Sequence, residues 1–136
     1  MLLTSELNLP GSVHGIIADC GFTSPHAIWR HVVSSKMHMS YGMRRRWINR
    51  VYEKHFKASI NALSTVNALA NGKTPVLFIH GAADRFVPVE MTYENYEACK
   101  APKRLLVVPG AHHGMSYVVD PEAYERATRE FFAAFD

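Results

Sequence analysis

Three short apolar runs divide the chain, at residues 13–20, 75–80 and 104–109. Each run is rich in Val, Ile, Leu or Phe and closes at a Gly or Pro turn signal, which predicts a β-strand. None of them alternates between polar and apolar positions. Continuous apolar runs are typical of strands that are covered on both faces, so the pattern favours a parallel sheet between layers of helices.

The segments between these runs have helical periodicity. Ser24-Pro25 has the form of an N-cap and first helical residue, and an apolar stripe follows it at Ile28, Trp29, Val32, Val33 and Met37. A second stripe covers residues 43–56, with a solvated face formed by Arg46, Arg50 and Lys54. Further helices are predicted at 60–69, ended by Asn71-Gly72, at 88–99, and from Asp120-Pro121 onward, where the buried side chains are Tyr124, Ala127, Phe131 and Phe135.

This order of elements, βα(αα)βαβα, predicts an α/β fold with about three parallel strands and right-handed crossovers. With 136 residues, 48% of them hydrophobic, the chain has the size of one domain spanning residues 1–136. The stretch 22–73 is longer than one crossover helix requires. We therefore expect it to be a helical cap or lid inserted between the first two strands.

Charge and cysteine content exclude several classes of protein. A net charge of +3 is too small to indicate nucleic-acid binding, and the run Arg44-Arg45-Arg46 is interpreted as part of a solvated helix face. The two cysteines form no disulfide framework, so the default expectation is a reduced, cytoplasmic compartment. There is no signal-peptide pattern and no apolar run long enough to span a membrane. Histidine spacing indicates no metal site, and we expect no cofactor.

Groups that could do chemistry follow each predicted strand. Ligands of open α/β sheets bind beyond the carboxyl ends of the strands, which makes these turns the candidate site. If the second and third strands are neighbours, Asp84 and His113 lie within reach of each other. A carboxylate that holds one imidazole nitrogen leaves the other free to take a proton from a nucleophile, the arrangement used in acyl-transfer catalysis.

Two of these segments resemble the α/β-hydrolases. The segment TPVLFIHGAADRFVP at 74–88 resembles their acid-bearing strand and loop, and VPGAHHGMSY at 108–117 resembles their histidine loop. VHGIIADCGF at 13–22 is similar to the strand after the nucleophile elbow in the bacterial serine peptidase and esterase branch. The resemblance implies that Asp84 is the acid and His113 the base of a Ser-Asp-His triad. Asp19 is the alternative acid, and His112 the alternative base.

The same resemblance implies a missing part. The nucleophile of the family lies in G-x-S-x-G, ahead of the acid and the base, and no such motif occurs here. Residues 1–9 resemble the remainder of the helix that follows the nucleophile. The chain is therefore interpreted as the C-terminal half of a serine hydrolase that acts on a small ester or peptide-like substrate. It is expected to be inactive alone.

Three alternatives remain beside this interpretation. Cys20 could replace the nucleophile, but it lacks the elbow glycines, so we expect a packing thiol.

Trp29 and Trp47, with Met37, Met39 and Met43, are expected mostly in the core, although in a cap some could line a pocket. Finally, the chain could be a non-catalytic assembly module. An uncovered edge at 13–19 would then pair with a second copy or with an N-terminal half.

Overall fold

The computed structural model describes residues 9–36 and 41–135. Its centre is a parallel sheet in the order β1-β2-β3, formed by β1 (Ile16–Asp19), β2 (Val76–Gly81) and β3 (Lys103–Val108). The register pairs Ile17 with Leu77 and Phe78 with Leu105, so the strands run side by side and their carboxyl ends meet at one edge of the sheet. The predicted α/β fold with three parallel strands is confirmed.

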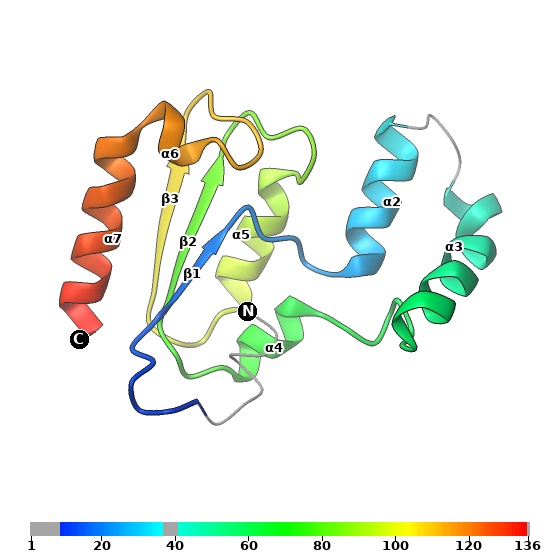
Figure 1. Cartoon of the computed structure of the whole chain (residues 1–136), viewed down its shortest axis with the longest axis horizontal. Coiled ribbons are helices and arrows are strands. Elements are labelled where there is room, and N and C mark those ends of the chain that lie inside the picture. The colour runs from blue at the N-terminus through cyan, green and yellow to red at the C-terminus, as the bar shows by residue number, and fades with distance from the viewer. Residues whose placement is uncertain (1–8, 37–40, 136) are drawn as a thin grey trace.

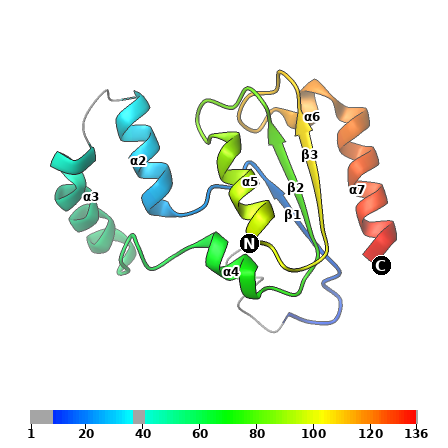
Figure 2. The ribbon, with the colours of Figure 1, turned by 180° about the vertical axis from the view of Figure 1, so that it is seen from behind.

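Six helices accompany the sheet in the described part of the chain: α2 (Pro25–Lys36), α3 (Tyr41–Phe56), α4 (Thr65–Asn71), α5 (Val89–Ala98), α6 (Ser116–Val119) and α7 (Pro121–Phe135). Figures 1 and 2 show α7 on one face of the sheet and α4 and α5 on the other. The helix α2 begins where the sequence predicts, because the Ser24 hydroxyl accepts a hydrogen bond from the Ala27 amide (3.0 Å) and so satisfies a free N–H of the first turn.

Two helical predictions need correction. The helix expected at 60–69 begins only at Thr65, because Ser64 caps it by accepting from the Asn67 amide. Ile60 is instead buried against α2 and α3. The second correction is α6, a single helical turn that periodicity did not indicate, since four residues are too few to form a stripe.

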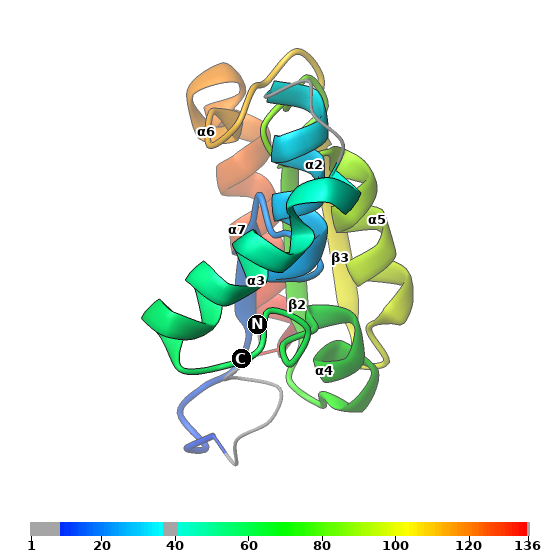
Figure 3. The same cartoon turned by 90° about the vertical axis from the view of Figure 1, so that its right-hand side faces the viewer.

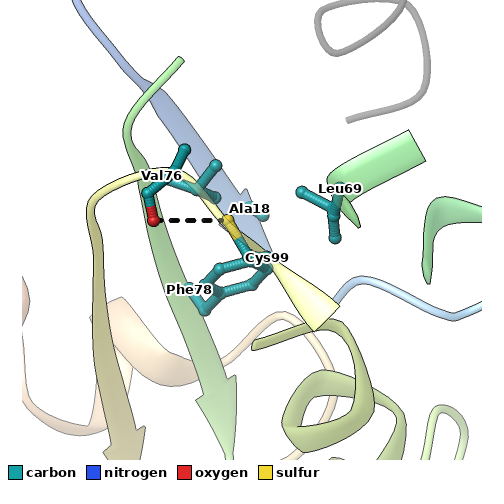
Figure 4. Packing of buried hydrophobic residues seen from close by; sticks show 6 residues of the cluster. Ala18, Leu69, Val76, Phe78 and Cys99 are labelled. Carbon is teal, nitrogen blue, oxygen red and sulfur yellow. Dashed lines mark hydrogen bonds between the residues drawn. The ribbon is translucent and has the colours of Figure 1, made fainter. Parts of the chain in front are cut away.

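Alternate residues of β2 pack on opposite faces of the sheet. Val76 and Phe78 lie in a cluster with Leu69 and Cys99 from the α4 and α5 side (Figure 4). The Cys99 thiol donates to the Ala101 carbonyl (3.8 Å). Leu77 and Ile79 pack against Phe131 of α7, with Tyr124, Ala127 and Phe135 partly buried around it. Both faces of β2 are thus apolar and covered, which explains why its sequence does not alternate.

The helices α2 and α3 stand apart from the sheet, and Figure 3 shows them from their own side. They pack on each other through Val33 and Ile48, with Ile60 in the same buried cluster. Arg46, Arg50 and Lys54 are exposed as predicted. The prediction that Trp29 and Trp47 lie in the core is wrong. They are 44% and 64% exposed. Trp29 instead lines an apolar pocket between α2 and the loops at the sheet edge, as the alternative interpretation of the cap allowed.

Some expectations fall outside the described residues. These are the helix expected in residues 1–9, of which only Leu9 is described, and the positions of Met37 and Met39. Among the helices that the structure does describe, none combines the length and the apolar character needed to cross a bilayer.

Candidate active site

The loops that follow β2 and β3 are tied together by backbone hydrogen bonds. The amide of Ala82 donates to the Val108 carbonyl (2.9 Å), and that of Ala83 donates to the Ala111 carbonyl (2.9 Å). Gly81 lies where the loops approach most closely. A Cβ at this position would lie 2.8 Å from the His112 carbonyl oxygen and closer still to the Ala111 carbonyl group, so only glycine fits without a shift. The two loops are therefore held in a fixed relation.

Asp84 uses its two carboxylate oxygens for different partners. Oδ1 accepts hydrogen bonds from the amides of Phe86 (2.8 Å) and Val87 (3.0 Å), which orders the turn. Oδ2 lies 2.7 Å from Nδ1 of His113. Burial by itself raises the pKa of the Asp84 carboxyl. The hydrogen bonds from His113 and from the two amides outweigh burial and hold that pKa below its ordinary value, so the group is a carboxylate at neutral pH.

His113 stands at the opening of the site, with its side chain 43% exposed. Its ring packs edge-to-face against Phe86, with 5.0 Å between the centroids. Because Nδ1 faces the carboxylate, Nδ1 carries the proton and Nε2 has its lone pair free. Within the described part of the chain, the side chain that forms a hydrogen bond with the His113 ring is that of Asp84.

The alternative site residues lie elsewhere. Nδ1 of His112 is 2.9 Å from the Ala83 carbonyl, so this ring buttresses the loop and does not approach Asp84. Asp19 accepts from the Tyr124 hydroxyl (3.2 Å) and from the Cys20 thiol (3.2 Å), which ties β1 to α7. The structure thus brings together the predicted pair Asp84 and His113. Their catalytic roles stay a prediction.

His80 is a buried neighbour of Asp84 that the sequence did not single out. Its ring is fully buried, with Nδ1 2.6 Å from the Thr92 hydroxyl and Nε2 2.9 Å from the Val87 carbonyl. A carbonyl only accepts, so Nε2 carries the proton and Nδ1 accepts from Thr92. Nε2 also lies 3.2 Å from Asp84 Oδ2. The sequence did contain an indication of this, because the His-Gly pair ends the apolar run of β2 and a histidine inside an apolar strand needs buried polar partners.

Cys20 is closer to the pair than the sequence argument expected. Its backbone is left-handed (φ +53°), and its half-buried Sγ accepts a hydrogen bond from the Gly114 amide (3.3 Å). It is therefore not simply a packing thiol. Burial, with the neighbouring Asp19 carboxylate, raises the pKa of the Cys20 thiol to about 11. At neutral pH the Cys20 thiol is protonated, which argues against Cys20 as a thiolate nucleophile.

An apolar pocket of about 540 Å³ opens beside His113. Its walls come from the end of β1, from α2 and from the loops after β2 and β3. They are formed by Cys20, Phe22, Ile28, Trp29, Val32, Phe86, Val87 and His113. Its size is that of a small-molecule site. The near absence of polar wall groups favours an uncharged, apolar occupant, because a charge placed there would lose its hydration without gaining a partner.

Two curated proteins match parts of the chain. The uncharacterized protein YqkD of Bacillus subtilis (strain 168) is 39% identical over 57 residues, which cover 42% of this chain and 19% of YqkD. The acylamino-acid-releasing enzyme of Rattus norvegicus is 41% identical over 58 residues, covering 40% of this chain and 8% of the enzyme. The matched segments span less than a fifth of either relative.

Solved structures share the fold over almost the whole chain. The acylaminoacyl peptidase of Pyrococcus horikoshii superimposes with a TM-score of 0.66 at 18% identity, over 97% of this chain and 21% of that protein. The family model described as X-Pro dipeptidyl-peptidase (S15 family) matches residues 24–114, a range that contains both Asp84 and His113. Because that match covers well over half of the sequence, the chain belongs to the X-Pro dipeptidyl-peptidase (S15) family of the α/β-hydrolases.

Proposed function

We propose that this chain supplies the acid and the base of a serine hydrolase that cleaves ester or peptide bonds. One observation carries the proposal: Nδ1 of His113 lies 2.7 Å from an Asp84 carboxylate that two backbone amides hold in place, at the mouth of an apolar pocket. Membership of a family of hydrolases supports it.

In the proposed reaction, a serine hydroxyl attacks the carbonyl carbon of the substrate while Nε2 of His113 takes the hydroxyl proton. Asp84 stabilises the imidazolium that forms. The same nitrogen then protonates the leaving amine or alcohol, and a water molecule repeats the sequence to release the acid. The ester or peptide places an apolar group against Phe86 and Trp29 in the pocket.

The 136 residues contain no G-x-S-x-G, so the nucleophile and the oxyanion donors are proposed to come from another polypeptide segment, covalently continuous or separate. Without them the acid–base pair has no hydroxyl to activate.

We expect the purified 136-residue chain to show no fluorophosphonate labelling and no p-nitrophenyl ester turnover above a heat-denatured control. Addition of a segment that carries the nucleophile is expected to restore both, with uncharged apolar acyl groups preferred to carboxylated ones. Labelling of the chain alone would contradict the proposal. Repeating the assay with Cys20→Ser would then show whether the thiol is the reacting group.

A second candidate function is assembly through the sheet edge. In the described residues β1 pairs only with β2, and Ile17 is 36% exposed, so the outer side of β1 offers unpaired backbone groups. We expect concentration-dependent association in light scattering, abolished by Ile17→Pro, which removes one N–H from this edge. A monomer at high concentration would contradict this second function and leave the hydrolase proposal standing.

A further inference from the structure

Cys20, Asp84 and His113 come from three separate strand ends and meet at one point. Their ligand atoms, a thiol sulfur, a carboxylate oxygen and a ring nitrogen, all lie within 4.8 Å of one another. The mechanism proposed above uses the last two and leaves Cys20 without a task. Sequence spacing could not indicate this cluster, because 64 and 29 positions separate its members along the chain.

The three groups form a donor set that thiophilic divalent cations select. Zn²⁺ binds cysteine sulfur, histidine nitrogen and carboxylate oxygen, and three protein ligands with one open position are a common coordination. Ligand atoms bound to one tetrahedral ion lie roughly 3–4 Å apart. The His113–Asp84 contact of 2.7 Å must therefore open slightly, which the exposed ring of His113 permits.

The surroundings fix two of the three ligands before any ion arrives. Oδ1 of Asp84 is held by two backbone amides, which orients Oδ2 toward the cluster. The Gly114 amide contacts Sγ of Cys20 at 3.3 Å, so the thiol already faces the histidine loop. Such outer hydrogen bonds are what orient the ligands of protein metal sites.

We propose that Cys20, Asp84 and His113 bind a thiophilic divalent cation such as Zn²⁺, and that this cation silences the acid–base pair. Binding releases the thiol proton and places the sulfur, the carboxylate and one ring nitrogen on the ion. If the ion takes Nε2, the base has no lone pair left; if it takes Nδ1, Asp84 no longer orients the ring. The inhibitory consequence rests on the proposed function, whereas cation binding does not.

The direct test is a Co²⁺ titration of the purified, untagged chain, monitored by the sulfur-to-cobalt charge-transfer band, with Zn²⁺ as the displacing ion. We expect a band that saturates at one ion per chain and disappears on addition of Zn²⁺. Cys20→Ser is expected to abolish it, and His113→Ala to weaken Co²⁺ binding by at least about tenfold. Cys99→Ser is the matched control, because Cys99 is buried on the α5 side of the sheet and its thiol contacts the Ala101 carbonyl.

Absence of the band in the wild-type chain, or a band that survives Cys20→Ser, would overturn the proposal. Circular dichroism checks that each variant folds. If the Cys20→Ser variant does not fold, His113→Ala still tests the proposal, because the His113 side chain is partly exposed and its removal leaves the core intact. Since this titration needs no hydrolysis, its failure is distinct from a failure of the hydrolase proposal. In the nucleophile-completed protein, half-inhibition of ester hydrolysis by Zn²⁺ is expected to need at least about tenfold more ion after Cys20→Ser.

Discussion

Asp84→Asn is expected to lower kcat/KM for ester hydrolysis by about 10⁴-fold in the protein completed by its nucleophile segment. An asparagine keeps the shape of the side chain but carries no charge to stabilise the imidazolium. Its amide group can also donate to Nδ1 of His113, which moves the ring proton to Nε2 and removes the base. The measurement is steady-state hydrolysis of a p-nitrophenyl ester, with folding of the variant checked by circular dichroism.

Asp19→Asn is the matched control for this substitution. Asp19 is the last residue of β1 and lies at the same edge of the sheet as the loop that carries Asp84, but its partners are Tyr124 and Cys20, so most of the activity is expected to remain. A large loss with Asp19→Asn and a small one with Asp84→Asn would reverse the assignment of the acid.

Gly81→Ala is expected to destabilise the chain by about 3 kcal/mol, at the upper end of the usual cost of overpacking. The added methyl group would meet the backbone carbonyls of Ala111 and His112, and backbone cannot rotate away as a flexible side chain can. Relief requires the loop after β3 to move off β2, which separates His113 from Asp84. Urea denaturation followed by tryptophan fluorescence measures the change in the free energy of unfolding.

Gly11→Ala serves as the control, since a Cβ there meets no atom within 4 Å and is expected to change stability by less than about 0.5 kcal/mol. Equal stability of the Gly81→Ala and Gly11→Ala variants would show that the two loops do not approach as closely as described.

The sheet was predictable because its signal is local. Each strand is a short apolar run closed by a turn residue. In the helices between them, the capping hydrogen bonds and the burial of the apolar stripe favour the same structure. The errors occur where local signals compete. Residues 60–64 have apolar positions compatible with a helix, but Ser64 offers a better N-cap. Trp29 and Trp47 have the spacing of core residues, yet burial depends on what covers a face, which periodicity does not encode.

The site was predictable only in part. Asp84 and His113 follow adjacent strands, so parallel pairing of β2 and β3 was enough to place them together. Cys20 depends on a third strand and on a left-handed backbone at its own position, neither of which a local pattern specifies. The placement of the His80 ring beside Asp84 depends on a hydrogen bond to Thr92 of α5, so it can be recognised only once that helix is packed.

The parallel pairing of the strands also orders the assembly of the site in time. Residue 76 pairs with residue 103 on one side and with residue 16 on the other, so β2–β3 closes a much shorter loop than β1–β2. Longer loops lose more chain entropy on closure and form their contacts more slowly. We therefore expect the βαβ unit of β2, α5 and β3 to form before β1 joins the sheet, which brings the Asp84 carboxylate and the His113 imidazole together first. The thiol of Cys20, which directly follows β1, is expected to join them when that strand docks.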